Sequence, residues 1–442
     1  MARTPLESWI RTRIGLKETE PLSRLALERY QLRKLRETIA HACATSPFYR
    51  QHLTDCTELG SLTDLARFPF TVPNDLQEDE RRFLCVSPRE IERVVTLQSS
   101  GTTAPPKRLH FTAEDLELTV DFFHHGMSTL VRPGERVLIL MPGELPGSVG
   151  DLLVKGLARL DVEGIVHGLV RDPAEVLAVI ADRQVDCLVG IPVQVLALAR
   201  HPLATTVPHG RLKSVLLSAD YVPGAIVREL SSIWGAAVFN HYGMTETGLG
   251  GGVECDQRCG YHLREADLYF EVVDPVSGQV LPAGEPGEVV LTTLTRYGMP
   301  LIRYRTRDVA RFLTEPCPCG TLLPRLERVN GRLANRVRLT GGETVTMAAL
   351  DEALFPLPFI LNFQPVLRSI DGLDVLDLTI ETVTVNCDDV AGPVRQALLT
   401  ISALAAAFAG RRLLLGPIKQ EPLPVTGSIK RTIIDRRKGN TC

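Results

Sequence analysis

Short apolar runs alternate with helical stretches through the middle of the chain. The runs are rich in Val, Ile and Leu, and each is followed by a segment with the apolar spacing of a helix. Such alternation is typical of a largely parallel sheet covered by helices, so an α/β fold is expected. The predicted strand and helix pairs are 137–141 with 149–160, 164–166 with 173–182, 187–190 with 193–200, and 215–218 with 224–234, before a last strand at 237–240.

The segments on either side of this region have other patterns. Residues 22–53 have helical spacing, interrupted at Pro47 because a proline disfavours the helical conformation of the residue before it. We expect a helical N-terminal cap over residues 1–60. Short strands separated by turns predict a β subdomain over about residues 260–330.

The last hundred residues predict a small α+β domain. A strand is expected at 375–384, and an Ala/Leu-rich stretch predicts a single helix at 394–408. We therefore divide the chain into a large α/β domain at 1–332, which includes the helical cap and the β subdomain, and a small mobile domain at 333–442.

Composition excludes several classes of function. The chain has 442 residues, a formal net charge of -3 and 23% charged residues, which gives no basic surplus for nucleic acid. No apolar run approaches the roughly 18 residues of a membrane span, and residues 1–20 lack the apolar core of a signal peptide. We expect a cytoplasmic protein of two or three domains that binds neither nucleic acid nor membranes.

A loop rich in small and hydroxyl residues follows a strand-like segment at 93–97 and ends at Lys107. Glycine permits close backbone approach, serine and threonine donate hydrogen bonds, and lysine adds a positive charge, which together suit a polyphosphate. A polar turn has the same composition, so the loop alone leaves both readings open. The loop residues in question are Ser99, Ser100, Gly101, Thr102 and Thr103.

Further polar segments follow the loop in a fixed order. They are Ser218-Ala219-Asp220, His241-Tyr242-Gly243-Met244-Thr245-Glu246-Thr247, Tyr304-Arg305-Thr306-Arg307-Asp308 and Gly331-Arg332. With the loop, they resemble the signature segments of adenylate-forming (AMP-binding) enzymes, and nearly the whole chain resembles the phenylacetate-CoA ligase-like branch. Segments 46–50, 68–71 and 316–320 resemble motifs of that branch.

The resemblance implies a site for ATP and Mg²⁺. The loop with Lys107 would hold the β- and γ-phosphates, Thr245 would contact the α-phosphate, and Glu246 would ligate Mg²⁺. The adenosine is expected to lie against the remaining residues of the set: Ala219, Asp220, Tyr242, Gly243, Asp308 and Arg332. Each residue alone has an ordinary structural explanation, as a core, turn or surface residue; their joint order favours the nucleotide site.

The chain departs from the family near its C-terminus. Ser428 stands where the family has a lysine that reaches the α-phosphate and the carboxylate. In an extended segment Lys430 would point to the same side, roughly 6.6 Å further on, so we take Lys430 with Thr245 and Glu246 as the catalytic set. The alternative is that Lys430 is a solvated surface charge.

Three cysteines and a histidine suggest a metal site. Cys255, His262, Cys317 and Cys319 form a Cys₃His set suited to tetrahedral Zn²⁺ in a structural role. Their spacing is looser than that of a zinc finger, and Cys259 competes for membership. Reduced free thiols near a turn are the alternative.

The resemblance implies an AMP-forming ligase. ATP and a carboxylic acid, expected to be aromatic, would give an acyl adenylate and pyrophosphate, and CoA would then displace AMP. The partners are therefore an acid, ATP and CoA, with a homodimer left open. Two alternatives remain: an adenylyltransferase of the coenzyme F390 synthetase type, which transfers AMP itself, and a degenerate nucleotide-binding homologue.

Overall fold

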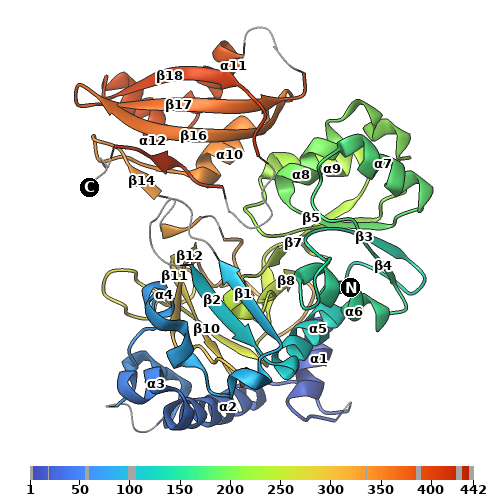
Figure 1. The fold of residues 1–442 in the computed structure, drawn as a ribbon, viewed down its shortest axis with the longest axis vertical. Coiled ribbons are helices and arrows are strands. Elements are labelled where there is room, and N and C mark those ends of the chain that lie inside the picture. The colour runs from blue at the N-terminus through green and yellow to red at the C-terminus, as the bar shows by residue number, and fades with distance from the viewer. Residues whose placement is uncertain are drawn as a thin grey trace. The chain divides into compact units, whose positions relative to one another are not determined.

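The computed structural model describes residues 3–17, 19–54, 59–97, 106–329, 331–333, 336–384, 390–424 and 431–437. Contacts between Cα atoms group the chain into two compact units, residues 1–168 with 239–329 and residues 169–238 with 330–442 (Figure 1). The predicted domains divide the chain differently, because the second unit also takes in residues 169–238. The division at 332/333 stays a prediction.

Helices cover the N-terminal part of the first unit. Ser46 Oγ accepts from Tyr49 N at 3.2 Å, and Pro47 begins the next helix at a position whose N–H would lack a helical partner, so the predicted break is confirmed. The helices are α1 (Pro5–Arg13), α2 (Arg24–Thr45), α3 (Pro47–His52), η1 (Leu62–Arg67), α4 (Pro73–Asp79), η2 (Glu80–Phe83), η3 (Pro88–Glu90), α5 (Ala113–Met127), α6 (Val149–Ala158) and η5 (Thr245–Thr247).

The strands of the first unit form several ladders. They are β1 (Arg93–Leu97), β2 (Lys107–Phe111), β3 (Arg136–Leu140), β4 (Glu163–Val166), β7 (Ala237–Tyr242), β8 (Gly252–Glu254), β9 (Tyr261–Leu263), β10 (Leu268–Val273), β11 (Gly287–Thr293), β12 (Tyr304–Ala310) and β13 (Arg325–Leu326). Strands β3 and β4 are parallel, whereas β10, β11 and β12 form an antiparallel sheet that confirms the β subdomain. Leu97 pairs with Lys107, so the predicted phosphate loop connects β1 to β2.

Buried polar contacts fix the start of β12. The Tyr49 hydroxyl accepts from Ile302 N at 2.9 Å, and Thr71 Oγ1 donates to Ile302 O at 2.7 Å. Arg303, which is 1% exposed, donates to both carboxylate oxygens of Glu271 at 3.0 and 3.1 Å. Since a buried ion pair with two hydrogen bonds has a fixed geometry, the Arg303 side chain is held in place.

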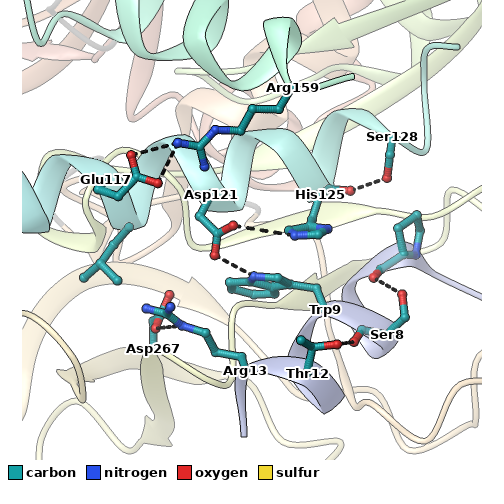
Figure 2. Close-up of polar contacts among 12 residues, drawn as sticks. Ser8, Trp9, Thr12, Arg13, Glu117, Asp121, His125, Ser128, Arg159 and Asp267 are labelled. Atoms are coloured by element: carbon teal, nitrogen blue, oxygen red, sulfur yellow. Dashed lines mark hydrogen bonds and ion pairs between the residues drawn. The ribbon is translucent and has the colours of Figure 1, made fainter. Parts of the chain in front are cut away.

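Helix α1 is held against α5 by a partly buried hydrogen bond (Figure 2). Trp9 Nε1 donates to Asp121 Oδ2 at 2.8 Å, and His125 Nε2 lies 3.6 Å from Asp121 Oδ1. Burial alone would raise the pKa of Asp121, but His125 and Trp9 outweigh it and lower the pKa to about 2. The ionised carboxylate therefore contributes to the docking of α1.

Trp9→Phe is expected to lower the free energy of unfolding by about 1–2 kcal/mol at pH 7, because a hydrogen bond to a charged group is lost. The depressed pKa of Asp121 stabilises the fold above about pH 4, and this contribution is lost as the pH falls through about 2. The difference from wild type should therefore shrink over that range. Urea unfolding at several pH values measures it; Thr12→Ala, on the same helix, is the control. Equal midpoints for Trp9→Phe and wild type at pH 7 would refute this role of Trp9.

The second unit combines two parallel strands with a mixed four-stranded sheet. Strands β5 and β6 are parallel, and the sheet has the order β18-β17-β16-β19. The elements are α7 (Pro173–Asp182), β5 (Cys187–Gly190), α8 (Pro192–Ala199), η4 (Pro202–Thr206), β6 (Ser214–Leu217), α9 (Gly224–Trp234), β14 (Arg336–Arg338), β15 (Thr344–Thr346), α10 (Met347–Leu354), β16 (Ile360–Ile370), β17 (Leu373–Thr382), α11 (Ala391–Leu399), α12 (Ser402–Ala409), β18 (Leu413–Gln420) and β19 (Ile434–Asp435).

The prediction of one helix at 394–408 is wrong. The segment forms α11 and α12, which are bent by 104°. Ile401 is extended, with φ -84° and ψ 109°, and it precedes the first residue of α12. Thr400 and Ile401 are β-branched residues with low helix propensity, which favours a break at this point.

Among the described residues, no single helix has both the length and the apolar character needed to cross a membrane. The bent pair α11 and α12 meets that test by length and composition alone.

Candidate active site

The predicted phosphate-binding lysine and the predicted magnesium ligand contact each other. Lys107, the first residue of β2, donates from Nζ to Glu246 Oε1, and also to the Tyr304 hydroxyl at 3.1 Å. The Tyr304 hydroxyl in turn donates to Glu246 Oε1 at 2.9 Å. The side chain of Glu246 is 2% exposed and that of Lys107 is 19% exposed. The three side chains form a closed polar cluster at the base of the β1–β2 connection.

This cluster keeps the Glu246 carboxylate ionised. Burial alone would raise the pKa of Glu246, but the Lys107 ammonium and the Tyr304 hydroxyl outweigh it, and the pKa is lowered. An ionised carboxylate is the form that ligates a hard divalent cation.

The turn that carries Glu246 is closed by its own hydrogen bonds. Thr247 Oγ1 donates to Met244 O at 2.8 Å and accepts from Met244 N at 3.1 Å. Gly248 ends the short helix η5 at φ +71°, a left-handed conformation that favours glycine. These contacts orient the buried side chains of Thr245 and Glu246.

Gly243 is required for close packing of this segment. A Cβ atom at Gly243 would lie 2.4 Å from Leu249 O and 2.5 Å from His241 Cε1, and a backbone oxygen cannot move aside as a flexible side chain can. The sequence analysis predicts that Gly243 contacts the nucleotide. Close packing in the structure is a second reason for a glycine at this position.

Gly243→Ala is expected to lower the free energy of unfolding by about 2 kcal/mol, as overpacking typically does. Gly126→Ala in α5 is the matched control, because its added Cβ would make an ordinary 3.6 Å contact with Val253 Cγ1. Urea unfolding of both variants measures the difference. Equal unfolding midpoints would contradict the packing argument.

The predicted adenosine residues Tyr242 and Asp308 lie together. The Tyr242 hydroxyl donates to Asp308 Oδ2 at 3.1 Å, and the two residues are 5% and 1% exposed. The Tyr242 ring also stacks on Tyr261, with ring centroids 5.7 Å apart. The structure therefore brings a ring and a carboxylate from distant segments into one buried pair.

The Ser218-Ala219-Asp220 segment lies in the second unit. Ala219 has φ +74°, an unfavourable conformation for a residue with a Cβ atom and one that often marks functional sites. Asp220 Oδ1 accepts from Tyr221 N at 2.9 Å. Glu352 of α10 accepts from the Tyr221 hydroxyl and from Gly224 N, both at 2.8 Å. The C-terminal segment of the chain thus supports the loop that carries Ala219 and Asp220.

The structure does not place several of the predicted site residues in the candidate site. Arg332 is half-buried in the second unit. Residues Ser99 to Thr103, Ser428 and Lys430 lie outside the described residues. Their roles stay predictions.

The four predicted metal ligands converge in the first unit. The Sγ atoms of Cys255 and Cys317 are 3.7 Å apart, and Cys319 Sγ lies 3.7 Å from His262 Nε2. All four are buried, and their ligand atoms lie within 4.8 Å of one another. Cys259 is not part of this set; its Sγ instead accepts from Arg325 Nη1 at 2.8 Å. The set can hold a tetrahedral ion, since ligands about 2.3 Å from zinc lie about 3.8 Å apart.

The turn that carries two of these cysteines is tied to the N-terminal helix. Thr321 Oγ1, two residues after Cys319, donates to Glu7 Oε2 of α1. Arg325 of β13 donates to the backbone oxygens of Cys259, Glu315 and Pro316. The cluster therefore joins segments that are far apart in sequence.

The sequence gives no role to two residues near Glu246. Tyr304 could have been found, because it begins the Tyr304–Asp308 segment. Arg296 has no such signal: it is 6% exposed, its Nη1 has no hydrogen-bond partner, and burial lowers its pKa to about 10. A Cβ atom added to Gly248 would lie 3.2 Å from Arg296 Nη2, so the guanidinium lies directly beside the residue that ends η5.

The fold is that of enzymes that form acyl adenylates. A crystal structure of 2-hydroxyisobutyryl-CoA ligase in the postadenylation state, in complex with an acyl adenylate, superposes with a TM-score of 0.77 at 21% identity, covering 92% of this chain and 89% of that one. Anthranilate CoA ligase in complex with anthranoyl-AMP superposes with a TM-score of 0.57 at 18% identity, covering 76% and 65%.

The chain belongs to the family of AMP-binding enzymes, whose profile matches residues 36–294. The phenylacetate-coenzyme A ligase of Pseudomonas putida is 31% identical over 329 residues, which cover 72% of this chain and 73% of that protein. The enzyme of the same name from Thermus thermophilus is 30% identical over 384 residues, 82% and 83% of the two chains. Both the predicted family and the predicted branch are therefore confirmed.

Proposed function

We propose that this protein is an AMP-forming ligase that activates a carboxylic acid with ATP and transfers the acyl group to CoA. The observation that carries the proposal is the buried, ionised Glu246 beside Lys107. A carboxylate that attacks the α-phosphate needs positioning and neutralisation of charge more than covalent help from the protein. Family membership and the two phenylacetate-coenzyme A ligases support the same reaction.

The residues would divide the work as follows. Glu246 would hold Mg²⁺, which supplies positive charge at the phosphates, while Thr245 donates a hydroxyl hydrogen bond to the α-phosphate. Asp308 would accept from the ribose hydroxyls, and Tyr242 would contact adenine. Lys107 would bind the β- and γ-phosphates with residues 99–103, and we retain Lys430 as the candidate that replaces the family lysine.

The acid substrate is expected to be aromatic. This expectation is supported by the relatives named for phenylacetate. Pyrophosphate release tests the expected substrate class. It is measured with ATP, Mg²⁺ and each acid of a panel of aromatic and aliphatic acids, with and without CoA. Release that depends on an aromatic acid, with thioester formed only when CoA is present, is the expected result. Release without any acid dependence would contradict the proposal. An adenylylated acceptor without thioester would point instead to an adenylyltransferase.

We also propose a structural Zn²⁺ bound by Cys255, His262, Cys317 and Cys319. Thiolates and an imidazole are preferred zinc ligands, and the two 3.7 Å separations fit a tetrahedral ion. Without an ion, burial raises the pKa values of Cys255 and Cys317. The ion would join the turn at 317–319 to β9, and it would take no part in the chemistry.

A further inference from the structure

Lys107 and Glu246 are needed by different partners during the proposed reaction. Lys107 is to bind phosphate oxygens and Glu246 is to bind a divalent cation, yet in this structure each is the ionic partner of the other. While this contact persists, Lys107 is not free to bind phosphate and the Oε1 atom of Glu246 is not free to bind a cation, because the Lys107 ammonium lies against that atom. A divalent cation at this carboxylate would therefore compete with the Lys107 ammonium for the Oε1 atom.

We propose that Lys107 is a displaceable counter-ion of Glu246, which blocks the metal site until the phosphates of the nucleotide draw the lysine away. The proposal rests on the proposed function and adds an order to it: a divalent cation without nucleotide has to compete with Lys107 for Glu246. The triphosphate gives Lys107 a new anionic partner and so frees the carboxylate for the metal. Metal and nucleotide then bind with positive coupling.

The surroundings of Glu246 allow the lysine to leave without disturbing the carboxylate. Tyr304, 1% exposed, donates its hydroxyl directly to Glu246 Oε1 at 2.9 Å, so this hydrogen bond does not run through the Lys107 ammonium. The turn at 244–248 is closed by Thr247, independently of Lys107. Tyr304 is thus a positioning residue that presents the carboxylate to either cation.

A second cation keeps the site from becoming an uncompensated buried anion during the exchange. The guanidinium of Arg296 lies beside Gly248 and interacts electrostatically with Asp115 and, less strongly, with Glu246, and no carboxylate forms an ion pair with it among the described residues. A buried charge that loses its partner is strongly unfavourable, so a fixed positive charge nearby lowers the cost of releasing Lys107.

The Lys107 ammonium is the mobile partner of the pair. Its side chain is 19% exposed against 2% for Glu246, and it begins β2 directly after the connection that carries the predicted phosphate loop. A flexible four-carbon stem can move its ammonium by several ångströms while the backbone stays paired with Leu97.

The exchange is tested by measuring Mn²⁺ binding in the absence of nucleotide. The zinc-loaded full chain is titrated with Mn²⁺, and electron paramagnetic resonance measures the concentration of Mn²⁺ that stays free in solution. Lys107→Met keeps the length of the stem and removes the charge. It is expected to bind one Mn²⁺ about ten-fold or more tightly than the wild type, the size of a typical coupling. Lys107→Met/Glu246→Gln should lose this gain. Lys155→Met, which removes the charge of an exposed lysine paired with Asp151, should leave Mn²⁺ binding unchanged.

Two outcomes would overturn the proposal. One is a Lys107→Met protein, folded by circular dichroism, that binds Mn²⁺ no more tightly than the wild type; Lys107→Gln serves if the Met variant does not fold. The other needs no lysine variant: tight Mn²⁺ binding by the wild type without nucleotide, abolished by Glu246→Gln. Pyrophosphate release by the wild type is measured separately, so failure of the exchange is distinguishable from failure of the proposed function.

Discussion

Glu246→Gln is expected to lower acid-dependent pyrophosphate exchange by about 10²- to 10³-fold, the usual effect of removing one electrostatic contributor to a transition state. Glutamine keeps the size of the side chain and can still accept from the Tyr304 hydroxyl. It lacks the negative charge that would hold Mg²⁺ and that pairs with Lys107. Exchange of radiolabelled pyrophosphate into ATP at saturating Mg²⁺ measures the loss.

Glu271→Gln is the matched control for this substitution. Glu271 is also a buried carboxylate in the first unit, but its partner is Arg303. Its loss should lower the free energy of unfolding, because it leaves a buried arginine without its ion pair, while exchange per folded molecule stays within a few-fold of wild type. If Glu246→Gln retained exchange as well as Glu271→Gln does, Glu246 would have no role in the chemistry.

Loss of the proposed zinc is expected to have the largest effect on stability. Cys317→Ser should contain no zinc, whereas the wild type should contain one ion per chain. The Tm should fall by about 4 °C, which corresponds to about 4 kcal/mol for a protein of 442 residues, because binding of a structural metal contributes directly to folding. Elemental analysis of metal-replete protein and calorimetry measure the two quantities.

Two other cysteines separate the metal from the thiol itself. Cys259→Ser should keep its zinc, since Cys259 contacts Arg325 and lies outside the cluster. Cys187→Ser replaces a fully buried thiol in β5 that is not a predicted metal ligand. The fall in its Tm gives the loss of stability caused by a buried hydroxyl alone. A wild type without stoichiometric zinc, or a Cys317→Ser protein that melts like Cys187→Ser, would contradict the proposed site.

The fold was predictable where the pattern was local and repeated. Apolar runs bounded by turns predicted β5 at its observed ends, and the helical spacing predicted α7 and α9 likewise. The break between α11 and α12 was missed, because alanine and leucine have the same apolar pattern in one helix as in two. The grouping of residues 169–238 with the C-terminal segment has no local signal in the sequence, since it depends on contacts such as Arg200 with the backbone oxygens of Phe355 and Leu357.

The candidate site was predictable as a set of residues but not as a set of contacts. Motif order identified Lys107 and Glu246, and residue type identified the Cys₃His set that the structure brings together. The ion pair between Lys107 and Glu246 joins residues 139 positions apart, and no local signal predicts it. Arg296 was missed because an arginine in a loop resembles a surface charge until its burial is known.

The central claim is that a carboxylate oxygen attacks the α-phosphate of ATP. The most direct test uses a carboxylic acid labelled with ¹⁸O in both oxygens. The acid is incubated with the full chain, ATP, Mg²⁺ and CoA, and the products are analysed by mass spectrometry. The account predicts AMP that carries one ¹⁸O atom, a CoA thioester that retains the other, and unlabelled pyrophosphate. AMP without label, or labelled inorganic phosphate formed together with ADP, would contradict it.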